Sequence, residues 1–97
     1  MYAAVVVLKP GADQAKASVD SASLTDAFWA HAQEGDGMEH VRIADGADGF
    51  SVVLFMHGGD EAEVATSALA LCWRLVMVMP PLTGWYVDSC VVRGAWR

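Results

Sequence analysis

The sequence predicts a single α+β domain, residues 1–97, with the element order strand, helix, strand, strand, helix, strand. Three observations predict it. The chain opens on an apolar, β-branched run. Two short segments of alternating or apolar character, residues 38–44 and 50–56, flank a spacer rich in Gly and Asp. Residues 61–78 then repeat apolar side chains at the helical period of 3.6.

The first strand is expected from Tyr2 to Leu8. Its apolar character is unbroken and Pro10 follows closely, which is typical of a strand covered on both faces. Such a strand belongs in the middle of a sheet.

The first helix is expected from Leu24 to Glu34. Ser23 and Asp26 resemble a capping box, and Gly35 is placed as a C-terminal stop. A start near Ala12 stays open, because the residues that follow tolerate helix well. One stripe of this helix carries Leu24, Ala27, Phe28 and His31, which predicts a core position for the histidine.

A hairpin is expected next, from a strand at Met38–Ala44 through a turn at Asp45–Gly49 to a strand at Phe50–Met56. The two glycines of the turn are expected to supply positive φ. Side chains of the first of these strands alternate between two faces: Val41 and Ile43 on one, His40 and Arg42 on the other.

The second helix is expected from Glu61 to Val78, with Asp60 as N-cap and Pro80-Pro81 ending it. The last strand is expected from Trp85 to Arg93. Alternation places Trp85, Val87, Ser89 and Val91 on one face, and Tyr86, Asp88, Cys90 and Val92 on the other.

This element order predicts the split β-α-β, ferredoxin-like arrangement: a four-stranded antiparallel sheet with both helices on one face. Val41, Ile43, Trp85, Val87 and Val91 are then expected beneath the helices. The other face is expected to hold His40, Arg42, Tyr86, Asp88, Cys90 and Val92. From the third strand we favour Ser51, Val53, Phe55 and His57 on that face over Phe50, Val52, Leu54 and Met56, although a one-residue slip exchanges the sets.

Charge and hydropathy exclude two classes of partner. Twelve acidic residues against six scattered basic ones give a net charge of −6, so nucleic acid and anionic membrane surfaces are not expected as partners. The apolar stretch Ala68–Leu82 contains Arg74 and is too short to span a bilayer. The start of the chain has no secretory pattern, and Cys72 and Cys90 lack metal or redox spacing; a cytoplasmic protein with free thiols is expected, although a disulfide between them stays possible. The high alanine content indicates a GC-rich bacterial genome.

Apolar residues make up 55% of the chain, more than a small globule buries. Part of this surplus is expected to meet another surface, most simply a second copy of the chain in a homodimer.

The layout resembles the dimeric α/β barrel superfamily, which includes antibiotic-biosynthesis-monooxygenase-like and YciI-like proteins. The features that carry the resemblance are the opening Val5–Gly11, the strand Phe50–Met56 and the capped helix start Asp60–Glu63. The resemblance implies two sheets closed around a pocket. Catalytic roles do not transfer, because His31 and Asp26 lie at unmatched spacing and the second helix has no histidine.

The free sheet face mixes apolar and polar residues, which predicts a ligand pocket at a subunit interface. The expected ligand-binding residues are His40, Arg42, His57, Tyr86 and Asp88. His57 suits acid–base chemistry, and the His40–Arg42 pair suits a carboxylate or enolate. Alternatively these residues are solvated at strand ends, and Asp88 forms an ion pair with Arg42. Neither a cofactor nor a metal is expected, since a metal would need His40, His57 and Asp88 to converge.

The second helix suggests a rival function. Trp73 and Met77 lie one turn apart on its outer side, where a solvated helix normally carries charge, and Trp96 in the C-terminal tail could extend the patch. The leading hypothesis is a small homo-oligomeric protein that binds, or transforms without metal, a small organic molecule. The alternatives are a non-catalytic accessory or regulatory protein that docks through this patch, and a structural dimer without ligand.

Overall fold

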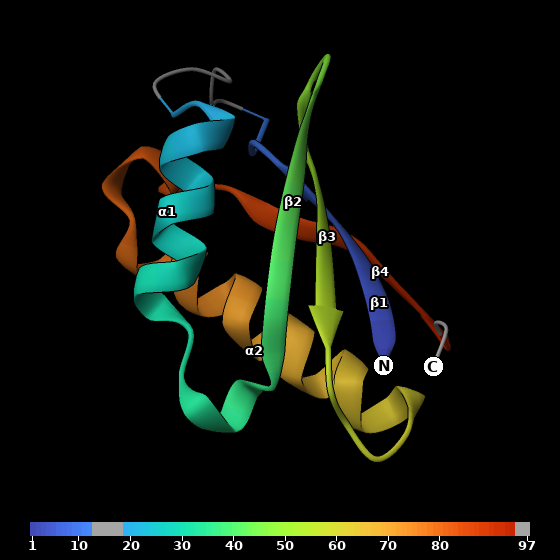
Figure 1. The fold of residues 1–97 in the computed structure, drawn as a ribbon. Coiled ribbons are helices and arrows are strands. Elements are labelled where there is room, and N and C mark those ends of the chain that lie inside the picture. The colour runs from blue at the N-terminus through green and yellow to red at the C-terminus, as the bar shows by residue number, and fades with distance from the viewer. Residues whose placement is uncertain (13–18, 95–97) are drawn as a thin grey trace.

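In the computed structural model the chain forms a four-stranded antiparallel sheet and two α-helices, with residues 1–12 and 19–94 described (Figure 1). The predicted α+β class and the predicted order of strands and helices are confirmed. The elements are β1 (Tyr2–Lys9), α1 (Ser21–His31), the 3₁₀ turn η1 (Glu34–Asp36), β2 (Met38–Gly46), β3 (Gly49–Met56), α2 (Glu61–Val78), the 3₁₀ turn η2 (Pro80–Leu82) and β4 (Tyr86–Gly94).

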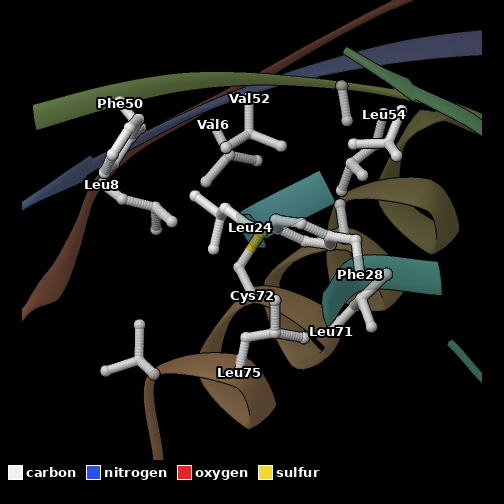
Figure 2. Close-up of a cluster of buried hydrophobic side chains, with 14 of the residues drawn as sticks. Val6, Leu8, Leu24, Phe28, Phe50, Val52, Leu54, Leu71, Cys72 and Leu75 are labelled. Atoms are coloured by element: carbon white, nitrogen blue, oxygen red, sulfur yellow. The ribbon is translucent and has the colours of Figure 1, made fainter. Parts of the chain in front are cut away.

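The strands lie in the order β2-β3-β1-β4, so β1 and β3 are central and β2 and β4 form the edges. Alternation buries one face of the two central strands, and both helices pack on this face (Figure 2). The buried members are Ala4, Val6 and Leu8 on β1, and Phe50, Val52, Leu54 and Met56 on β3. The helices contribute Leu24 and Phe28 from α1 and Leu71, Cys72 and Leu75 from α2. Burying a side chain such as Phe28 in this core contributes about 2–3 kcal/mol.

Helix α2 begins and ends where the sequence predicts. The Asp60 carboxylate accepts the backbone N–H of Glu63 at 2.8 Å, which satisfies one of the free donors of the first turn. The helix ends before Pro80, which has no N–H to continue it. No helix within the described ranges is long and apolar enough to cross a bilayer.

Helix α1 starts and ends three residues earlier than predicted. Its N-cap is Asp20, whose carboxylate accepts the Ser23 N–H at 2.7 Å, so the predicted cap at Ser23 is wrong. The side chain of His31 is exposed in the last turn, and its predicted core position is also wrong. The alternative start near Ala12 would run through residues 13–18, which lie outside the described residues.

Helix α1 ends early because a partly buried ion pair holds the chain that follows it. Arg74 of α2 donates to the Asp36 carboxylate at 2.9 Å and to the His31 carbonyl at 3.1 Å. The same carboxylate accepts the Gln33 N–H at 2.7 Å, which turns the backbone away from the helix axis. These hydrogen bonds hold the end of α1 against α2 and direct the chain towards the start of β2. Burial alone would raise the pKa of Asp36, but the hydrogen bonds from Arg74 and Gln33 lower it overall.

The β2–β3 hairpin is tighter than predicted. Gly46 pairs with Gly49, which leaves only Ala47 and Asp48 in the turn. Neither glycine has positive φ, so the predicted reason for them is wrong. Gly49 is required for close approach instead, because a Cβ there would lie 2.2 Å from the Leu8 carbonyl oxygen of β1.

The predicted faces of β4 hold only for its first residues. Trp85 is buried and stacks on Phe50 with ring centroids 5.6 Å apart, and Val87 pairs with Leu8 on the helix side. A register shift at Asp88 then inserts an extra residue and reverses the alternation. Cys90 and Val92 therefore pair with Val6 and Ala4 on the helix side, and Ser89 and Val91 pair with Val7 and Val5 on the other.

Candidate functional site

The candidate site is the open face, defined as the side of the sheet away from both helices. Residues that pair across antiparallel strands share a face, so the register gives its layout row by row. The central row is Arg42, Val53, Val5 and Val91, read from β2 to β4. The row on one side is His40, Phe55, Ala3 and Arg93, and that on the other is Ala44, Ser51, Val7 and Ser89.

The middle of the open face is apolar and no other part of the described chain covers it. Ala3, Val5 and Val7 on β1 are only half-buried, although β1 is a central strand. Val53 and Phe55 beside them are also half-buried, and Val91 is 48% exposed. The predicted placement of Val53 and Phe55 on this face is confirmed. Within the described residues of one chain, the second face of β1 is not covered as predicted.

An aromatic group lies at the β2 edge of the open face. The His40 ring lies between Trp29 of α1, with centroids 6.4 Å apart, and Phe55 of β3, with centroids 5.9 Å apart. Trp29 is 48% exposed, so a flat ligand could reach its ring from solvent. The sequence pointed to His40 but not to Trp29, because nothing in the sequence shows that α1 lies along this edge.

Beyond the end of β3, His57 forms an ion pair with Glu39. A register shift between Met38 and His40 places Glu39 at a bulge. The backbone N–H of His57 donates a hydrogen bond to the Gly37 carbonyl at 2.8 Å. Gly37 has φ of 77°, and a Cβ there would lie 2.6 Å from the His57 carbonyl oxygen. The predicted site residue His57 therefore lies at the β2–β3 end of the face, with a carboxylate partner that the sequence reasoning missed.

The β4 edge carries the remaining predicted site residues. Tyr86 is exposed and pairs with Lys9 of β1, and the Asp88 carboxylate lies 3.5 Å from the Lys9 ammonium. The predicted ion pair between Asp88 and Arg42 is wrong, because two strands separate their edges.

The five predicted ligand-binding residues thus form two groups within one chain. His40, Arg42 and His57 lie at the β2 side, and Tyr86 and Asp88 lie at the β4 side. Three strand intervals of about 4.8 Å put roughly 14 Å between these edges. The described residues form no pocket in a single chain and no group of three or more His, Cys, Asp or Glu suited to a metal ion.

Charge is segregated between the two sides of the molecule. Of the four Lys and Arg residues in the described ranges, Lys9, Arg42 and Arg93 lie on the open face, and Arg74 is held by Asp36. Within the same ranges, Asp88 is the acidic residue that forms an ion pair with a cation of this face, Lys9. The other carboxylates lie on α1, η1, the hairpin end and the start of α2, or, for Glu39, against His57.

The outer side of α2 is exposed as predicted. Trp73 is 41% exposed and Met77 79% exposed. Trp96, the third predicted interface residue, lies outside the described residues.

Both cysteines are free thiols. Cys72 is buried, and burial, with a smaller contribution from the nearby Cys90, raises the pKa of its thiol to about 12. The pKa of Cys90 is also raised by burial. Neither thiol is activated, which disfavours nucleophilic cysteine chemistry.

Comparisons of the chain with known protein families, curated proteins and solved structures found no match.

Proposed function

We propose that this chain is a ferredoxin-like homodimer that binds a small organic molecule in a pocket formed where two open faces meet. The single observation that carries the proposal is the apolar middle of the open face. Monomeric proteins rarely leave a contiguous apolar patch on a sheet in water, and such patches mark binding surfaces.

The strand order β2-β3-β1-β4 supports the ferredoxin-like part of the proposal, since a split β-α-β topology places the first and third strands in the centre. The half-buried side chains of β1 support the dimer part. A second sheet packed about 10 Å away would cover Val5 and Val53. Both faces of β1 would then be buried, as the unbroken apolar sequence of this strand predicts.

The edges of the open face support the ligand part. Apolar residues fill the centre, and His40, Arg42, Ser89 and Arg93 lie at its borders. Ligand sites are typically apolar surfaces with a few converging polar groups. The imidazoles of His40 and His57 lie at the β2 side of this face, where their ring nitrogens could form hydrogen bonds with a bound molecule.

Light scattering of the purified protein tests the dimer, with Val5→Lys as the disrupting variant. Wild type is expected at twice the 10.3 kDa of one chain, and Val5→Lys at the mass of one chain with its circular dichroism spectrum retained. Ala70→Lys, which adds the same charge to the exposed side of α2, is the matched control and is expected to stay dimeric. A monomeric wild type at about 100 μM, or a dimeric Val5→Lys, contradicts the proposal.

A second candidate function is a non-catalytic accessory protein that docks through Trp73 and Met77. The exposure of these two side chains favours it. Trp73→Glu separates the two functions. If the outer side of α2 is the interface, Trp73→Glu no longer binds its partner protein or no longer forms a dimer. If the open face is the interface, the variant has the same mass as wild type in light scattering.

A further inference from the structure

We infer that the ligand of the open face is an aromatic or branched carboxylate, bound through the guanidinium of Arg42. The inference rests on the proposed function and names the chemical class of its ligand. It is drawn from the segregation of charge: an acidic chain, with net charge −6, places three cations on one sheet face.

Lys9 already has a carboxylate partner in Asp88, but Arg42 and Arg93 form no ion pair with any described residue. When two open faces meet, Arg42 and Arg93 of both subunits bring four guanidinium groups to an interface from which part of the water is excluded. A charge that loses water without gaining a partner is costly. The described carboxylates are mostly on the other side of the molecule, so an anion from solution is the simplest partner for these arginines.

The surroundings of Arg42 select a particular kind of anion. Arg42 lies in the central row beside Val53, and the next row places His40 and Phe55 alongside. A guanidinium binds a carboxylate through two parallel hydrogen bonds, whereas the neighbouring rings and methyl groups favour a flat or branched apolar body. A ligand with its carboxylate at Arg42 would extend over Val53 towards Val5 in the middle of the sheet.

Titration calorimetry with 1-naphthoate tests this class of ligand, with 1-naphthylmethanol as the neutral analogue of similar shape. We expect naphthoate to bind wild type about tenfold or more tightly than the alcohol, since a charge-assisted pair is lost with the alcohol. Raising the salt concentration should weaken naphthoate binding and leave binding of the alcohol nearly unchanged.

Three variants locate the site. Arg42→Gln is expected to weaken naphthoate binding about tenfold, and Arg42→Lys to give a smaller loss, because it keeps the charge without the paired hydrogen bonds. Thr66→Glu makes the same change in net charge as Arg42→Gln on the exposed side of α2, and we expect binding within twofold of wild type.

A monomeric wild type in light scattering overturns the proposed function. A dimer that binds naphthoate no better than naphthylmethanol, or binds neither, overturns the inference and leaves the dimer intact. Unchanged naphthoate affinity in both Arg42 variants also overturns it. If Arg42→Gln dissociates the dimer, its loss of naphthoate binding is not informative. The affinity of Arg42→Lys for naphthoate is then the deciding measurement, since this variant keeps a cation at position 42.

Discussion

Replacing Arg74 with Met removes the guanidinium that joins α2 to η1 and keeps most of the aliphatic stem. The variant loses the hydrogen bonds to Asp36 at 2.9 Å and to the His31 carbonyl at 3.1 Å. The Asp36 side chain is only 11% exposed, so its carboxylate would keep the Gln33 N–H but little water. Breaking a buried pair costs about 3–5 kcal/mol, and the partial exposure of Arg74 points to the lower end, about 3 kcal/mol.

Urea unfolding followed by circular dichroism measures this loss. For a domain of this size, about 3 kcal/mol corresponds to a fall in Tm of roughly 12–24 °C. Glu34→Gln, an exposed change in the same turn, is the control and is expected within about 0.5 kcal/mol of wild type. An Arg74→Met protein as stable as this control would refute the role assigned to the ion pair.

The same pair predicts a dependence on pH. The folded pKa of Asp36 lies below its ordinary value of 3.8, so its contribution to stability is complete above that value and is lost as the pH falls through the folded pKa. The difference in unfolding free energy between wild type and Arg74→Met is therefore expected to be constant from neutral pH to about pH 5 and to narrow below about pH 4. A difference that stays constant into the acid range would show that ionised Asp36 is not its origin.

Three further predictions concern single residues. Asp60→Ala removes the N-cap of α2 and is expected to lower the unfolding free energy by about 1 kcal/mol, whereas Asp60→Asn should retain most of it; equal losses in urea titrations would argue against the cap. Gly37→Ala combines positive φ with a contact at 2.6 Å and is expected to destabilise by about 2 kcal/mol or more, in contrast to Gly35→Ala, which has open space; similar melting temperatures for the two would contradict the close approach. Cys72 is expected to resist a thiol reagent at pH 8 until urea unfolds the chain, because burial raises its pKa to about 12; rapid labelling of Cys72 in the folded protein would contradict this.

Local sequence signals located most elements. The Asp60 cap, the clean helical period and Pro80 fix both ends of α2 without help from the rest of the chain. Alternation along β2 and β3 likewise assigned His40, Arg42, Val53 and Phe55 to their face.

The errors arise where distant parts of the chain decide local structure. The end of α1 depends on Arg74, which lies 38 positions from its partner Asp36. The bulge at Asp88 depends on how β4 pairs with β1, and this bulge reversed the faces of Cys90 and Val92. Period-two alternation cannot reveal an inserted residue, so this part of the open face could not be predicted from the sequence.

The candidate site followed the same pattern. The sequence identified its polar residues but expected them in one cluster, because alternation gives the face of a residue and not the position of its strand in the sheet. The order β2-β3-β1-β4 separates Arg42 from Asp88 and places Val5 and Val53 on the two central strands between these edges. The predicted site and the site in the structure have in common an apolar centre with cationic side chains at its borders.

The most direct test of the account is an isotope-filtered NOE measurement on an equal mixture of ¹³C-labelled and unlabelled chains. We expect intermolecular NOEs to the methyl groups of Val5, Val53 and Val91, since these lie at the centre of the surface assigned to the second subunit. Intermolecular NOEs confined to Trp73 and Met77, or none at all at millimolar concentration, would contradict it.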